Sequence, residues 1–69
     1  MTVAEALEIE RGALVYFGND QNDRGIVKDN NGEVLIVRWG RDAEDSMHVI
    51  APKGLANVHR LAAAERGGR

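Results

Sequence analysis

The sequence predicts an all-β fold, a small five-stranded barrel, from three observations. The first is a central run of β-prone aliphatic residues, Val34–Val37. The second is a set of four further short apolar runs, and the third is the polar, glycine-containing stretches between the runs. Short β-prone runs separated by turn signals are typical of small sheets. Closing a sheet of this size into a barrel removes its exposed edges.

The central strand is predicted over Val34–Trp39, between the turn signal Asn30–Gly32 and Gly40. Its shortness, its bounding turns and its β-branched residues favour a strand over a helix. Side chains alternate across a strand, so one face carries Leu35, Val37 and Trp39 and the other carries Val34, Ile36 and Arg38. Both faces are mostly apolar, which predicts that this strand is covered on both sides.

Two strands are predicted before the central one. Gly12–Gly18 places Ala13, Val15 and Phe17 on one face and Leu14 and Tyr16 on the other. Asn19–Asp23 has no apolar side chain and is predicted to be a solvated loop. Arg24–Asp29 forms the second strand, with Gly25 and Val27 opposite Ile26 and Lys28. Asn30–Gly32 predicts a hairpin turn, because Asn and Gly tolerate the positive φ angles that tight turns need.

The rest of the chain predicts two more strands. Gly40–Asp45 is a second charged loop, and Ser46–Ile50 is a short strand with Met47 and Val49 opposite His48 and Ile50. Ala51–Gly54 turns the chain, and Leu55–Asn57 forms a 3₁₀ turn. Val58–Leu61 is the fifth strand.

The N-terminal segment has two possible conformations. Thr2 and Glu5 have the capping-box spacing that starts a helix of one or two turns. So short a helix forms only if Val3 and Leu7 cover a surface, and the alternation in Glu8–Arg11 permits an extended arm instead. The sequence thus divides into an arm or short helix over residues 1–10, a barrel over residues 11–61 and a flexible basic tail over residues 62–69.

Composition limits the classes of protein to consider. The chain has 69 residues, no cysteine and a net charge of −2, which together predict one domain without disulfides or cysteine-based zinc sites. Residues 1–52 hold ten acidic against five basic side chains, whereas residues 53–69 hold four basic against one acidic. There is no apolar run long enough to span a membrane and no signal-peptide pattern, so we expect a cytoplasmic protein.

Several short stretches resemble the SH3-like small barrels, in particular the KOW and Tudor-like group. They are Gly12–Val15, Arg24–Val27, Val37–Trp39 and the later strand that begins at Val58. The resemblance covers residues 11–61 and extends to small bacterial domains with a Val-Arg-Trp central strand. It implies a five-stranded SH3-like barrel with a short N-terminal helix or arm and a flexible C-terminal tail.

The resemblance also carries expectations about function. KOW modules commonly bind nucleic acid, ribosomal proteins or transcription proteins, and their first loop is usually basic, whereas Asn19–Asp23 here is acidic. Tudor-like modules hold methylated side chains in a cage of several aromatic rings. The three aromatic residues here are Tyr16, Phe17 and Trp39, and the last two lie on predicted inward faces. No cage is therefore expected.

The residue pattern predicts no catalytic, cofactor or metal site. His48 and His59 lie on separate strands without metal-site spacing, so both are expected to be half-exposed strand residues. Ser46 is the only serine and no nucleophile-elbow motif surrounds it. No glycine-rich phosphate loop is present either, so we expect a non-enzyme without cofactors.

The leading hypothesis is a non-catalytic binding module, or adaptor, that engages another protein or a second copy of itself, with no membrane or small-molecule partner. The candidate partner-binding residues are Tyr16, Arg38, Trp39, Asp42, Glu44 and Asp45. Trp39 has two interpretations, since it either fills one end of the barrel or lies at its mouth against a partner. The acidic cluster is either a solvated hairpin tip or an attraction for a basic partner.

The alternative is a KOW-type module that contacts nucleic acid phosphates. Its candidate residues are Arg24, Lys28, Arg38, Lys53, Arg60, Arg66 and Arg69. The acidic charge of residues 1–52 makes this the second choice.

Overall fold

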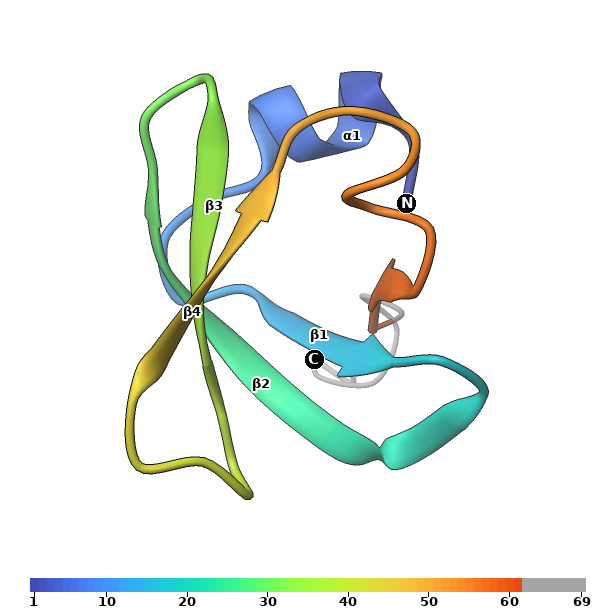
Figure 1. Cartoon of the computed structure of the whole chain (residues 1–69), viewed down its shortest axis with the longest axis vertical. Helices are drawn as coiled ribbons and strands as arrows, with labels where there is room; N and C mark the ends of the chain where they lie inside the picture. The colour runs from blue at the N-terminus through green and yellow to red at the C-terminus, as the bar shows by residue number, and fades with distance from the viewer. Residues whose placement is uncertain (62–69) are drawn as a thin grey trace, which may run out of the picture.

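A computed structural model describes residues 1–61 of the chain, which contain one helix and five strands (Figure 1). The elements are α1 (Val3–Glu8), β1 (Leu14–Phe17), β2 (Asp20–Asn30), β3 (Val34–Trp39), β4 (Asp45–Val49) and β5 (Val58–Arg60). They form one antiparallel sheet in the order β4-β3-β2-β1-β5. The predicted all-β fold with five strands and a short N-terminal helix is confirmed, whereas the predicted tail lies outside the described residues.

The sheet is curved but is not closed into a barrel, so the predicted closure is wrong. Strands β4 and β5 are its two edges, and within residues 1–61 no strand pairing joins them. The segment that connects them, residues 50–57, runs past α1 (Figure 1). Leu55 from this segment joins the same core as Ala6 and Ile9 of the N-terminal segment. Turn and helix cover the core where a barrel would use strand pairing.

Strand β2 begins earlier than the sequence predicts. Residues 20–23, predicted as loop, belong to β2, and Phe17 pairs with Asp20 across a tight turn in which Gly18 has a φ of +61°. Gln21 and Asn22 are exposed there, because this end of the hairpin extends beyond the core. A strand segment with no buried face needs no apolar residues, so the polar composition of residues 20–23 does not distinguish a strand from a loop.

One face of the sheet forms the core. The side chains of Val15, Val27, Leu35, Val37, Trp39, Leu55 and Val58 are fully buried. This confirms the predicted alternation in β3. The opposite face of β3 is not covered as predicted, since Val34 and Ile36 are only half-buried and Arg38 is exposed. With a single six-residue helix, already packed on the core side, residues 1–61 supply no second layer.

Gly25 allows the closest packing within this core. A Cβ atom built there would lie 2.7 Å from Cε3 of Trp39 and 2.8 Å from Cγ1 of Val37. Any side chain at this position would therefore push β2 away from the indole ring. The glycine is thus required by packing rather than by a turn.

Helix α1 is fixed at both ends by side chains. The predicted capping box is present, with Glu5 N donating to Thr2 Oγ1 at 3.1 Å and Thr2 N donating to Glu5 Oε1 at 2.8 Å. The hydrogen bond from the Thr2 backbone lowers the pKa of Glu5. Ala6 and Ile9 are buried, whereas Leu7, expected to cover a surface, is 51% exposed.

Asn30 joins the C-terminal end of the helix to the sheet. Its Nδ2 donates to the carbonyl oxygens of Ala6 at 2.9 Å and Ile9 at 3.2 Å, and its Oδ1 accepts from Gly32 N at 3.0 Å. The sequence predicted only a turn residue here. In the structure the same side chain satisfies helix-end carbonyls and shapes the β2–β3 turn.

Replacement of Gly25 by alanine should destabilise the fold by about 1–3 kcal/mol, because the new methyl group overpacks the core against Trp39. Urea denaturation followed by tryptophan fluorescence measures this. Gly40→Ala is the matched control, since a Cβ there meets its nearest neighbour, the Arg24 carbonyl oxygen, at an ordinary 3.5 Å. Equal stability of the two variants would contradict the packing argument.

Asn30→Ala should lower the free energy of unfolding by about 1–2 kcal/mol, because part-buried helix-end carbonyls lose their donor. Amide hydrogen exchange should show α1 opening first. Asn19→Ala removes an exposed asparagine amide from the neighbouring hairpin and serves as the control. The proposed link between helix and sheet is wrong if α1 protection is the same in both variants.

Candidate functional site

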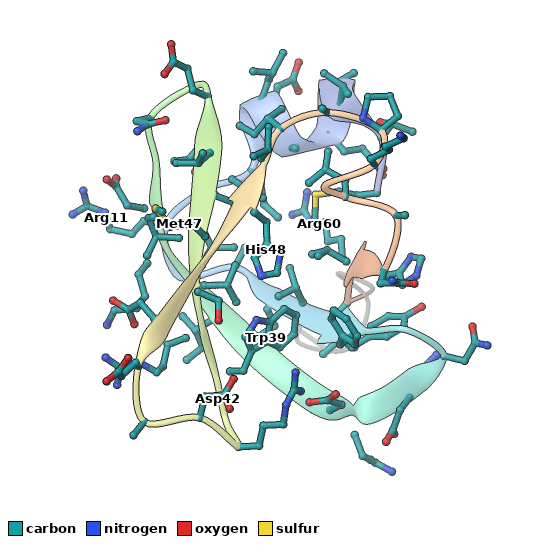
Figure 2. The ribbon with its side chains drawn as sticks, in the orientation of Figure 1. Arg11, Trp39, Asp42, Met47, His48 and Arg60 are labelled. Atoms are coloured by element: carbon teal, nitrogen blue, oxygen red, sulfur yellow. The ribbon has the colours of Figure 1, made fainter. Side chains whose placement is uncertain are left out.

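The outward side of the sheet carries a band of apolar side chains. Met47 is 72% exposed, Val49 56%, Ile26 45% and Leu14 40%. The strand register places Leu14 opposite Ile26, Ile36 opposite Met47 and Val34 opposite Val49. Figure 2 shows Met47 pointing away from the side of the sheet that holds His48 and Trp39. We call Leu14, Ile26, Val34, Ile36, Met47 and Val49 the apolar band, and this side of β1–β4 the outer face.

Two ion pairs lie among the side chains of the apolar band, because Ile26 is paired with Arg38 and Ile36 with Asp29. Arg11 Nη2 lies 3.4 Å from Asp29 Oδ1, and Arg38 Nε lies 2.6 Å from Asp45 Oδ1. Arg38 and Asp45 are directly opposite each other on β3 and β4. Because all four side chains are substantially exposed, these pairs contribute little to stability. They do set the charge pattern around the band.

The structure separates the predicted partner-binding residues. Arg38 and Asp45 lie together on the outer face, and Asp42 and Glu44 are exposed in the loop that leads into β4. That loop lines a shallow hollow of about 380 Å³ formed by Asp42, Ala43, Glu44, Asp45 and Ser46. Tyr16 lies on β1, separated from β3 by β2, with its ring 5.1 Å from that of His59.

Trp39 has to be removed from the candidate binding residues. Its side chain is 1% exposed and belongs to the core, because β3 turns it toward Gly25 and away from the outer face. Its indole ring meets Phe17 edge to face, with ring centroids 5.6 Å apart. Trp39 therefore fills the core and does not lie at a mouth against a partner.

Arg41 covers the end of the core beside Trp39. Its guanidinium carbon lies 5.4 Å from the Phe17 ring centroid and 5.5 Å from that of Trp39, and Arg41 also pairs with Asp23. The chain's own cation therefore occupies the space in front of these two rings. The sequence did not identify this cluster, because its members come from β1, β2, β3 and the β3–β4 loop.

The two histidines have different surroundings. His48 points to the interior beside Trp39 (Figure 2), and its Nε2 accepts a hydrogen bond from Trp39 Nε1 at 3.2 Å. Desolvation by the surrounding core lowers the pKa of His48. His59 lies on β5, the edge strand opposite β4, and its ring packs against that of Tyr16 on β1. Residues 1–61 contain no group of three or more side chains suited to hold a metal ion.

The residues of the nucleic-acid alternative do not share one surface. Arg24, Lys28 and Arg38 are exposed on the outer face, where Arg38 is paired with Asp45. Lys53 lies in the turn after β4, and Arg60 is on β5 opposite the inward-facing Val15. Arg66 and Arg69 lie outside the described residues.

The second apolar face of the central strand is part of the apolar band. The sequence predicts cover on both sides of this strand, and that prediction is wrong, because Val34 and Ile36 are partly exposed beside Met47 and Val49. Alternation identifies which residues share a face. It does not tell whether another layer covers that face.

Comparison with known proteins gives no match to a family model, a curated protein or a solved structure. The one helix in the described part of the chain is too short to cross a membrane.

The stability of the protein should fall as the pH is lowered through 6.5, the ordinary pKa of histidine. The folded state lowers the pKa of His48, so the unfolded chain binds more protons below that pH and is favoured there. Urea unfolding between about pH 8 and about pH 5 measures this, and His48→Gln, which keeps an acceptor for Trp39, should flatten the profile across this window. An unchanged slope in the variant would assign the dependence to other groups.

Proposed function

We propose that this protein is a non-catalytic binding module of the SH3-like small-barrel kind that engages another protein through its outer face. The observation that carries the proposal is the apolar band. Four of its six side chains are at least 40% exposed on one sheet face. Exposed apolar side chains that gather on one face of a small domain, here interrupted by Arg38 and Asp29, are typical of interaction sites.

The sheet order supports the SH3-like part of the proposal. Four strands follow one another as an antiparallel meander, and β5 returns to pair with β1 after a turn segment. This is the order of strand, turn and short final strand on which the sequence resemblance rests. Residues 50–57 connect β4 to β5, and the sheet itself stays open between these two edges.

The state of the ionisable side chains supports a non-catalytic role. Asp45 is paired with Arg38, Asp23 with Arg41, and the His48 ring with Trp39. The remaining carboxylates of the β3–β4 loop, Asp42 and Glu44, are exposed to solvent. These groups are engaged in structural contacts or in solvation.

Binding to nucleic acid through the outer face is the weaker candidate. Arg24 and Lys28 are exposed on β2 and favour it. Against it, Asp45 neutralises Arg38 and the adjacent loop adds Asp42 and Glu44. A surface that pairs its cations with carboxylates releases few counterions from DNA.

The proposal predicts that a photo-crosslinking residue at position 47 captures protein, whereas the same residue at position 7 does not. Both side chains are exposed, at 72% and 51%, but Leu7 is on α1 and off the outer face. The experiment is run in lysate of the organism of origin, with crosslinked products resolved by mass spectrometry. Equal capture at both positions, or no capture at either, counts against a binding role for the outer face.

The same proposal predicts no appreciable binding of fluorescent duplex DNA, single-stranded DNA or RNA in an anisotropy titration. Salt distinguishes the alternatives, because phosphate contacts weaken steeply between about 50 and about 200 mM. Micromolar binding that disappears at the higher salt, and that is lost in Arg24→Ala or Lys28→Ala, would favour the nucleic-acid function.

A further inference from the structure

We infer that the outer face is an interface between two copies of this chain, which pack face to face so that the β1–β2 half of one copy lies over the β3–β4 half of the other. The inference rests on the proposed binding role of the outer face and names its partner. It is carried by the apolar band, by the covered strand edges and by the distribution of charge across the sheet.

The size of the chain favours a whole face over a loop as the interface. A specific protein–protein interface buries about 800 Å² on each partner. That is roughly a sixth of the 4563 Å² of accessible surface of this chain. The β3–β4 loop, residues 40–44, spans only five residues, whereas the apolar band extends over β1, β2, β3 and β4. Stacking two sheets through such faces is an ordinary mode of β-sheet packing.

Strand addition at the β4 edge is a poorer alternative, because part of that edge is already covered. Ile50 N donates to Glu33 O. Backbone hydrogen-bonding groups alternate along a strand, so the N–H and C=O groups of His48 and Ser46 point to β3. Those of Val49, Met47 and Asp45 point to the open edge. Gly54 lies so close to Val49 that a Cβ at Gly54 would overlap the Val49 carbonyl oxygen. Only Asp45 and Met47 remain for pairing within this strand.

The charges of the outer face are unevenly divided between its halves. On the outer face, β2 and the adjoining Arg11 carry three basic side chains, Arg11, Arg24 and Lys28, against Asp29, while Asp20 and Asp23 lie at the Phe17 end of β2, where Asp23 pairs with Arg41. The β3–β4 half carries Arg38 against Asp45, and its connecting loop adds Asp42 and Glu44. Arg41 of the same loop is turned to the core side, over Phe17 and Trp39. In both ion pairs the arginine lies nearer β1 and the carboxylate nearer β4. The face is therefore positive toward β1 and negative toward β4.

This charge pattern is complementary to itself under one type of symmetry. A two-fold axis parallel to the strands exchanges the two halves and brings the positive half of each copy over the negative half of the other. A two-fold axis across the strands, still in the plane between the faces, would oppose like charges. The pattern also disfavours nucleic acid, because the negative half would face phosphate. A second copy thus fits both the apolar band and the charges among its side chains.

Sedimentation equilibrium of the full chain, from about 1 µM to about 1 mM, tests the inference across the range of weak to moderate affinity. We expect a monomer–dimer equilibrium that Met47→Lys weakens at least tenfold, because the lysine enters the interface from both copies. Leu7→Lys, the matched control on α1, should leave it unchanged. Circular dichroism verifies that both variants are folded, as expected for positions that are 72% and 51% exposed.

Charge reversal tests the orientation of the two copies. Arg24→Glu and Glu44→Lys should each weaken the dimer several-fold, because the axis along the strands brings Arg24 of one copy to the level of the β3–β4 loop of the other. The double variant should recover most of the loss, because opposite charges again face each other. A double variant weaker than either single variant overturns the inferred orientation. A chain that stays monomeric throughout, or a Leu7→Lys effect as large as that of Met47→Lys, overturns the interface itself.

The photo-crosslinking experiment separates this inference from the proposed function. A monomeric chain that still crosslinks to a different protein through position 47 refutes the second copy and retains the binding module. A monomeric chain with no crosslinks at position 47 refutes both.

Discussion

The fold depends on the close approach of Trp39 to the backbone of Gly25. The indole ring is the largest fully buried side chain, and it rests on β2 where a Cβ atom would stand 2.7 Å from Cε3. That contact holds β2 against β3 at their paired residues Gly25 and Trp39. From there the ring reaches Phe17 on β1 and His48 on β4, so one side chain links four of the five strands. Packing at interior density then fixes the remaining core residues around it.

A core built around one face leaves the other face to solvent. Residues 1–61 have a single short helix and a turn segment to cover apolar surface, and both lie on the core side with Ala6, Ile9 and Leu55. Nothing within residues 1–61 is left to cover Ile26, Met47 and Val49. Small domains bury a limited share of their surface for this reason. The apolar band stays exposed because α1 and residues 50–57 already pack against the core.

Much of the fold was predictable because it depends on local pattern. Strand alternation gave the buried residues of β3, and the spacing of Thr2 and Glu5 gave the helix start. The polar residues of early β2 were missed because a strand beyond the core has no apolar period. Asn30 was missed because its partners are more than twenty residues away along the chain. The outer face was misjudged because alternation cannot show whether another layer is present.

The same constraints favour the outer face as the site of the proposed partner. The end of the core beside Phe17 and Trp39 is occupied by Arg41 and Asp23. The β5 edge is engaged at Val58, whose carbonyl accepts from the Met1 amine, and the β4 edge is covered at Val49 by Gly54. Each of these sites is already filled by the chain's own residues. Ordering those residues costs conformational entropy, which their contacts offset. The apolar band has no such filler in residues 1–61, so the proposed partner would gain hydrophobic stabilisation by burying it.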